Sequence, residues 1–265
     1  MKRTNNYLAS VAMTLLLVVL SSAGAWAQSE VVEVGKTTYG HGYLPSRPNE
    51  KVSTSQQIYT SSEIGKAGMI TSIAFYNYDV GSKRNYDIYL SHTSKAAFNN
   101  ESDWVVVAES NRVFSGTVNL GSEWTVIDFE TPFQYDGKQN LLLTVDDNTG
   151  KSTGSNYNIG SYSASGHQAL FYYSSTNLDP TQPITEAGVF HPSYSSDERK
   201  NCIQLCFETN PKPYKLEAVE VGDVSAQIQC SLRGEATAWN LRYRKVAKNG
   251  EAEQPWTVVN NLTDR

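Results

Sequence analysis

The feature that most constrains the fold is a series of short β-branched and aromatic runs that starts near Gln57 and recurs along the chain. Clusters of Gly, Asn, Asp and Ser separate these runs, and almost no stretch has the 3.6-residue periodicity of a helix. Without helices for crossover connections, antiparallel sheets are favoured over a parallel sheet. The predicted fold class is therefore all-β, a jelly-roll β-sandwich. The predicted strands are Gln57–Thr60, Met69–Asn77, Tyr86–Ser91, Val105–Ala108, Val113–Val118, Trp124–Phe129, Leu141–Val145, Ala169–Tyr173 and Cys202–Phe207.

Period-two alternation predicts which side chains of a strand face the core. The run from Trp124 to Phe129 is a clear case. Because successive side chains of a strand point to opposite faces, one set should be buried and the other should face outward. The two sets are Thr125, Ile127 and Phe129 on one face, and Trp124, Val126 and Asp128 on the other.

Residues 1–27 have the organisation of a cleavable export signal. Lys2 and Arg3 form a positive start, Val11 to Leu20 is apolar, and Ala25-Trp-Ala27 is a small-x-small cleavage site. The apolar run is shorter than the roughly 20 residues that cross a bilayer. The sequence predicts cleavage before Gln28 and a secreted or cell-surface protein without a membrane span.

Charge excludes one class of partner. The chain has 22 Lys and Arg against 27 Asp and Glu, for a formal net charge of −5. Nucleic-acid binding requires clustered basic side chains that displace phosphate counterions. We therefore expect no nucleic-acid partner.

Nothing in the sequence forms a catalytic motif. The three cysteines, Cys202, Cys206 and Cys230, lie in strand-like runs and are predicted to be free thiols, because Cys202 and Cys206 are too far apart along a strand to pair. The four histidines are dispersed without metal-ligand spacing, and His92 is interpreted as a structural polar residue. Neither a nucleophile elbow nor a His-Glu-x-x-His motif occurs. The prediction is that the chain is not an enzyme.

A domain boundary is predicted at the Pro-containing segment 209–213, which separates a domain at 28–208 from a tail at 214–265. The tail resembles the first half of a fibronectin type III module, an immunoglobulin-like sandwich. Three runs carry this likeness, and the later strands of such a module do not follow. We therefore expect an incomplete sandwich and further domains after Arg265. The runs are Lys215–Val219, Ala226–Cys230 and Trp239–Arg244.

The run from Thr131 to Gly150 combines a turn, an apolar strand and an acidic turn. Asp136-Gly137 predicts a turn that leads into Leu141–Val145. Calcium binds carboxylate, amide and carbonyl oxygens, so the strand end predicts a Ca²⁺ site. The alternative is a simple turn in which Asx side chains bond their own backbone. The predicted ligands are Asp146, Asp147 and Asn148.

Together, Gln56–Gly65 with Ile70–Tyr76, Asn85–Thr93 and Thr131–Gly150 resemble the cleaved adhesin domains of gingipains and haemagglutinins. These are jelly-roll adhesin modules, and the likeness covers about residues 32–208. The resemblance implies an exported, non-catalytic binding module, frequently followed by fibronectin-like repeats and a sorting signal. Some members of the family bind structural calcium.

Aromatic side chains supply the candidate ligand-binding residues. Tyr157 and Tyr162 lie in a Gly-, Ser- and Asn-rich stretch, where we expect an exposed loop. Tyr172, Tyr173, Trp104 and Trp124 could add to a sugar-stacking or protein-binding face, the alternative being that these rings belong to the core. The favoured function is an adhesin-type module that binds a host surface protein or a glycan. The alternative function is an accessory carbohydrate-binding module of a larger exported hydrolase or peptidase.

Overall fold

The computed structural model describes residues 15–17, 29–36, 39–41, 43–79, 81–153, 158–176, 178–190, 198–208, 214–221, 226–231, 239–245, 255 and 257–262. The chain divides into two compact units. One is Ser29–Thr209, and the other combines Met1–Gln28 with Asn210–Arg265. The division falls inside the predicted linker 209–213.

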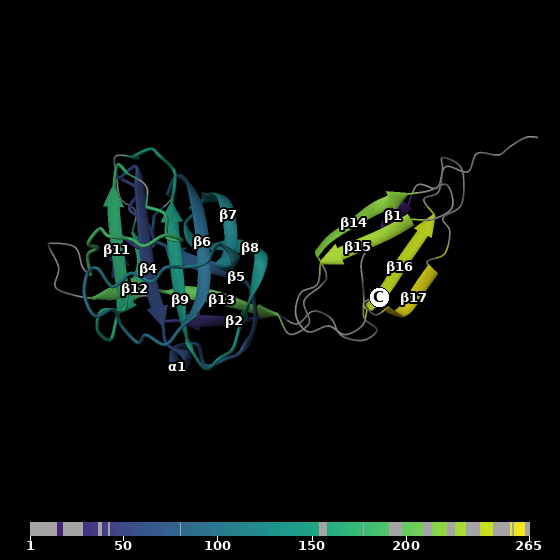
Figure 1. Cartoon of the computed structure of the whole chain (residues 1–265), viewed down its shortest axis with the longest axis horizontal. Helices are drawn as coiled ribbons and strands as arrows, with labels where there is room; N and C mark the ends of the chain where they lie inside the picture. The colour runs from purple at the N-terminus through teal and green to yellow at the C-terminus, as the bar shows by residue number, and fades with distance from the viewer. Residues whose placement is uncertain are drawn as a thin grey trace, which may run out of the picture. The chain divides into compact units, whose positions relative to one another are not determined.

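The Ser29–Thr209 unit contains a seven-stranded antiparallel sheet (Figure 1). Its strand order is β12-β10-β5-β13-β2, with β3 also paired to β10 and β8 to β5. The strands are β2 (Ser29–Val34), β3 (Tyr39–His41), β5 (Gly68–Asn77), β8 (Glu123–Tyr135), β10 (Ile159–Ser163), β12 (Arg199–Asn201) and β13 (Ile203–Glu208).

A five-stranded antiparallel sheet forms the second layer, with the order β11-β4-β9-β6-β7. Two very short helices, α1 (Ser61–Ile64) and η1 (Glu109–Asn111), accompany the sheets. The predicted all-β sandwich is therefore confirmed. The strands of this sheet are β4 (Val52–Tyr59), β6 (Lys83–Thr93), β7 (Arg112–Asn119), β9 (Asn140–Asp147) and β11 (Ala169–Ser174).

The main core lies between the two sheets, because each sheet buries one set of alternating side chains against the other. Strand β8 shows the pattern that its sequence predicted. Ile127 and Phe129 are 3% exposed and belong to the core, whereas Val126 is 58% exposed. The core draws on β5, β8 and β13 from the seven-stranded sheet and on β6 and β9 from the five-stranded sheet.

The predicted turn before β9 is also confirmed. Gly137 has φ +68°, a conformation that favours glycine. The Asp136 carboxylate accepts hydrogen bonds from the backbone amides of Lys138 and Gln139 at 2.8 and 3.0 Å. The turn then delivers β9 between β4 and β6, where its apolar side chains are buried.

Some local predictions were wrong. Val105–Ala108 is not a strand, because the Gln56 side chain takes the place of a partner strand. Gln56 accepts from Val105 N at 2.9 Å and donates to Val105 O at 2.6 Å. Strands β2, β3, β10 and β12 had not been predicted. Cys202 and Cys206 are free, as expected, but Cys206 is only half-buried.

The second unit contains two hairpin-like pairs (Figure 1). Strand β14 (Tyr214–Val221) pairs with β15 (Ala226–Ser231), and β16 (Trp239–Lys245) pairs with β17 (Thr257–Leu262). Strand β1 (Leu15–Leu17), within the predicted leader, pairs with β16 in this uncut chain. The predicted cleavage site before Gln28 lies outside the described residues, and the fibronectin-like identity of the tail stays a prediction. Within the part of the chain that is described, no helix is long and apolar enough to cross a membrane.

Candidate functional site

The end of β9 places its two carboxylates on opposite sides of the strand. Asp146 is 3% exposed and accepts a hydrogen bond from Thr54 Oγ1 at 2.7 Å. Its other oxygen accepts from Asn148 Nδ2 at 2.9 Å, and the same amide nitrogen donates to Asp87 Oδ2 at 2.9 Å. Burial raises the pKa of Asp146 to about 7, against the opposing hydrogen bonds from Thr54 and Asn148.

Asp147 has a different partner. Its carboxylate accepts from Arg84 Nε at 2.8 Å and lies 2.6 Å from Arg84 Nη2, and both side chains are fully buried. Its second oxygen accepts from the backbone amide and hydroxyl of Thr149. Arg84 in turn donates to the Lys151 carbonyl at 2.9 Å. Asp147 is therefore neutralised within the protein and fixes the loop that follows β9.

These contacts test whether the strand end suits calcium. The structure brings Asp146 and Asn148 together with Asp87, but it directs Asp147 to Arg84. Asn148 presents its Nδ2 group, a donor, between the two carboxylates. The described residues contain no group of three or more His, Cys, Asp or Glu side chains that could hold a metal ion. Asp147 is thus engaged by Arg84 while Asp146 and Asn148 lie with Asp87, and calcium binding at the strand end stays a prediction.

Of the two predicted ligand-binding tyrosines, the structure describes Tyr162. Tyr157 lies outside the described residues. Tyr162 lies in strand β10, not in a loop, and its ring packs beside the main core. Its hydroxyl donates to Glu63 Oε1 at 2.8 Å. The expectation of an exposed Tyr162 was therefore wrong, because the Gly- and Ser-containing sequence around it pairs as a strand with β3, β5 and β12.

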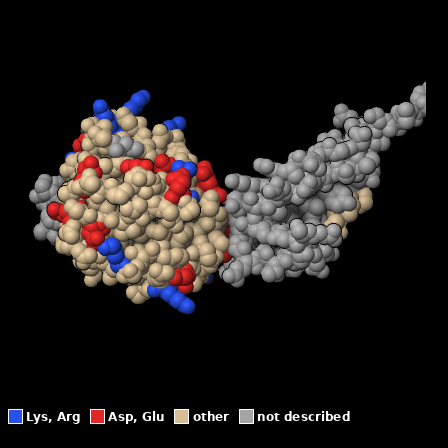
Figure 2. Space-filling view, viewed as in Figure 1, with Lys and Arg blue, Asp and Glu red and all other residues tan. Residues whose placement is uncertain are grey.

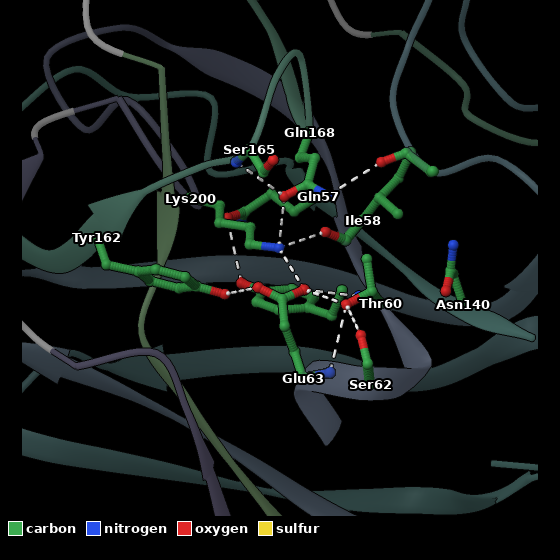
Figure 3. Close-up of polar contacts among 12 residues, drawn as sticks. Gln57, Ile58, Thr60, Ser62, Glu63, Asn140, Tyr162, Ser165, Gln168 and Lys200 are labelled. Atoms are coloured by element: carbon green, nitrogen blue, oxygen red, sulfur yellow. Dashed lines mark hydrogen bonds and ion pairs between the residues drawn. The ribbon is translucent and has the colours of Figure 1, made fainter. Parts of the chain in front are cut away.

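Tyr162 belongs instead to a buried polar group that we name the Lys200 network: Lys200, Glu63, Gln168 and Tyr162 (Figure 3). Lys200 comes from β12 and is fully buried. Its ammonium donates to Ile58 O at 2.9 Å, Glu63 Oε2 at 2.8 Å and Gln168 Oε1 at 2.8 Å. All three donors of the ammonium are therefore satisfied.

Helix α1 positions Glu63 in this network. Thr60 and Glu63 form a capping box, in which the Glu63 carboxylate accepts from the Thr60 backbone amide at 2.8 Å. Burial raises the pKa of Glu63, but hydrogen bonds from Lys200, Thr60 and Tyr162 outweigh it, and the net pKa is lowered. Burial also lowers the pKa of Lys200, an effect that Glu63 partly offsets. The pKa values of both members of the pair are therefore lowered, that of Glu63 by its hydrogen bonds and that of Lys200 by its burial.

A third group lies on the outer face of the seven-stranded sheet. Tyr76 of β5 is paired in register with Trp124 of β8, and their rings meet edge-on with centroids 5.4 Å apart. Tyr78 packs edge-on against Tyr76 at 5.2 Å and is 46% exposed. We name Tyr76, Tyr78 and Trp124 the aromatic platform. None of the three belongs to a core cluster, whereas Trp104, Tyr162 and Tyr173 all pack against one.

Polar residues fix and border the aromatic platform. Asn77 donates from Nδ2 to Thr125 Oγ1 at 2.9 Å and to Glu123 O at 3.2 Å, which anchors the start of β8. Glu123 has φ +62°, a conformation that non-glycine residues rarely adopt and that costs free energy. At the border, Asn158 Nδ2 donates to Asp79 Oδ2 at 2.9 Å. Glu123 directly precedes Trp124, so the backbone is locally strained at the point where it presents this ring.

The sequence analysis identified only part of the aromatic platform and none of the Lys200 network as a group. It named Trp124 as a candidate and grouped it with Val126 and Asp128 on one face of the strand, but it did not include Tyr76 and Tyr78. The alternation Tyr76-Asn77-Tyr78 at the end of an apolar run was the available signal. The Lys200 network was missed, because its members come from segments that are distant in sequence and carry no local pattern.

Comparisons with known proteins do not identify the chain. No protein-family model matches the sequence. No curated protein sequence matches it either. One solved structure with some likeness contains the cysteine protease and lectin-like domains of Cwp84, a surface layer associated protein of Clostridium difficile. The match has 9% sequence identity and a TM-score of 0.35, and it covers 69% of this chain and 36% of that one. A likeness this low supports no argument about function.

Proposed function

We propose that the Ser29–Thr209 unit is an exported, non-catalytic binding module that binds a glycan through the aromatic platform. The observation that carries this proposal is the presentation of Tyr76, Tyr78 and Trp124 on an outer sheet face, away from every core cluster. Aromatic side chains combine a large apolar surface with little conformational freedom, so they suit stacking against the C–H faces of sugar rings.

The surroundings of the platform suit the hydroxyl groups of a sugar. Asp79 and Asn158 are exposed, and they supply carboxylate and amide groups beside Tyr78, whose backbone amide donates to Asn158 O at 2.9 Å. Val126, 58% exposed on the outward-facing side of β8, adds apolar surface next to Trp124. An apolar centre with a polar border is the usual composition of a binding surface.

Charge and sequence add support. On the face of the described residues shown in Figure 2, Lys and Arg side chains form separate spots, several of them beside Asp and Glu, and not one continuous basic patch. The predicted leader supports export, and the adhesin resemblance supports a cell-surface binding role. An accessory carbohydrate-binding module of a larger exported hydrolase or peptidase would use the same platform.

Binding of the purified full chain to a glycan array and to insoluble polysaccharides tests the proposal. Trp124→Ala should weaken glycan binding by about tenfold or more, because a buried aromatic contact at a binding surface is commonly worth more than 1.4 kcal/mol. Tyr78→Ala should also weaken glycan binding. Tyr172, which the sequence grouped with Trp124, lies on β11 of the other sheet and is not part of the platform. Tyr172→Ala is therefore the matched control and should leave binding unchanged.

Melting temperatures of the three variants separate lost binding from lost folding. Glycan binding by Trp124→Ala at the wild-type level would contradict the platform. If the chain captured only proteins on a matrix array, and lost them in Trp124→Ala, the surface would be supported but the glycan would be rejected.

A further inference from the structure

The buried amine of Lys200 is held directly against a carboxamide and a carboxylate. Nζ lies 2.8 Å from Gln168 Oε1 and 2.8 Å from Glu63 Oε2 (Figure 3). Lys200 is fully buried and Gln168 is 4% exposed. An amine, a carboxamide and an acid–base group in contact are the components of amide exchange, in which a lysine replaces the ammonia of a glutamine side chain.

We propose that Lys200 and Gln168 form an intramolecular isopeptide bond, with Glu63 as the proton-transfer group. The bond would join β12 of the seven-stranded sheet to the residue that precedes β11 of the five-stranded sheet. It is therefore a covalent tie between the two layers of the sandwich. The proposal is independent of the glycan-binding function, since the aromatic platform shares no residue with the Lys200 network.

The reaction balances without any further reagent. The Glu63 carboxylate accepts a proton from the Lys200 ammonium, and the neutral Nζ then attacks Cδ of Gln168. A new Nζ–Cδ bond forms and the Cδ–Nε2 bond breaks. Glu63 returns this proton to the departing nitrogen, which leaves as ammonia. Nζ loses a second proton as it becomes the amide nitrogen, and Glu63 passes that proton to solvent, where the ammonia becomes ammonium. No atom changes its oxidation state, so no oxidant or reductant is required.

Burial lowers the pKa of Lys200, so Nζ loses a proton more readily than an amine in water, although the contact with Glu63 partly offsets this effect. The rings of Tyr59 and Tyr162 lie 5.0 and 5.4 Å from Nζ, so water is largely replaced by aromatic surface. Desolvation penalises the charged form of an amine. Glu63 is ionised and in contact, and its side chain is 28% exposed, which gives the released ammonia a route to solvent.

The carboxamide is also held in a fixed orientation. Gln168 Nε2 donates to the Ala96 carbonyl at 3.0 Å, and this bond fixes which end of the amide faces Lys200. The Ser165 backbone amide lies 3.4 Å from Oε1, where negative charge develops when Nζ attacks. A fixed donor at that position stabilises the tetrahedral intermediate. Holding both reactants in one geometry removes most of the entropic cost of their encounter.

A covalent link between the two sheets would also stabilise an exported domain. Exported domains are commonly stabilised by disulfides, and Cys202 and Cys206 do not form one with each other. Linking residues 168 and 200 constrains the unfolded chain in the way that a disulfide does. The proposed bond would be insensitive to reducing agents.

Mass spectrometry of the purified full chain tests the proposal. We expect the wild-type protein to be lighter by one ammonia at the peptides that carry Gln168 and Lys200, a loss counted apart from any cyclisation of an N-terminal Gln28. After trypsin digestion, the peptide that carries Gln168 should be joined to the peptide that begins at Lys200, and cleavage after Lys200 should be lost. Both results should persist under reducing conditions.

Variants identify the reacting groups. Lys200→Arg and Gln168→Met should carry their full sequence mass, and Glu63→Gln should form the bond about a hundredfold more slowly, as expected for loss of acid–base catalysis. Lys95→Arg is the matched control, because Lys95 is paired with the Asp103 carboxylate outside this network and should not affect the mass deficit. Wild-type protein that keeps its full mass, with no joined peptide after prolonged incubation, would overturn the proposal. A mass deficit that survives in Lys200→Arg would overturn it equally.

Discussion

The two sides of the β9 tip differ more than their adjacent positions suggest. Asp147 faces Arg84, a permanently charged partner, whereas Asp146 faces the neutral donors Thr54 and Asn148 with Asp87 nearby. Both carboxylates are buried, at 0% and 3% exposure. Burial raises the pKa of both carboxyls, but Asp147 is opposed by the charge of Arg84, whereas Asp146 has only neutral hydrogen-bond donors. Residue type alone does not determine whether a buried acid is structural or titratable.

We expect the largest effect on stability from breaking the ion pair between Asp147 and Arg84. Asp147→Asn should lower the free energy of unfolding by about 3–5 kcal/mol, because it leaves the Arg84 guanidinium buried without a counter-charge. Urea unfolding at neutral pH measures this loss. Asp128→Asn, on the exposed side of β8, is a control that should change stability little. A loss below 1 kcal/mol for Asp147→Asn would mean that solvent reaches Arg84.

Asp146, on the opposite side of the tip, should make the free energy of unfolding depend on pH. The pKa of Asp146 in the folded state is raised to about 7 from an ordinary value of 3.8, so the folded state binds this proton more tightly than the unfolded state. The contribution of this proton to stability is complete below about pH 4 and is lost as the pH rises through about 7.

Asp146→Asn removes that titration. The stability of the wild type relative to this variant should therefore fall by about 3 kcal/mol between pH 5 and pH 8. Urea unfolding of both proteins across this range measures the difference. A constant difference would show that Asp146 keeps an ordinary pKa. A difference that grows with pH would show that the pKa of Asp146 is lowered in the folded state.

Added calcium gives a second way to compare Asp146 with Asp147. Both oxygens of Asp147 are already engaged by Arg84 and Thr149, so Asp147→Asn should lose the same stability in millimolar calcium as in chelator. Any calcium-dependent rise in melting temperature should disappear in Asp146→Asn, because only Asp146 lies beside a second carboxylate, Asp87. Calcium stabilisation lost in Asp147→Asn alone would contradict this assignment.

The sequence predicted what depends on local pattern. The alternation of Ile127 and Phe129 with Val126 placed β8 correctly, since only one register buries the apolar set. Gly137 marked its turn, because few other residues adopt its positive φ. The sequence did not show that Gln56 would pair with Val105, or that Lys200 would meet Glu63 and Gln168. Such contacts depend on how the two sheets pack, and polar residues in a buried strand such as β4 have no periodic signature.

The smallest expected effect isolates the hydrogen bond that supports Asp146. Thr54→Val keeps the shape of the side chain but removes the 2.7 Å bond from Thr54 Oγ1, which favours the ionised carboxylate. We expect a loss of about 1 kcal/mol above pH 8, where Asp146 is ionised, and a smaller loss at pH 5, where the protonated carboxyl depends less on this donor. The pKa of Asp146, followed by NMR, should rise further in the variant. Because Thr54 donates nothing to Asp147, the cost of Asp147→Asn should be the same in the Thr54→Val background as in the wild type. Coupling between the two substitutions would mean that the two sides of β9 act as one site after all.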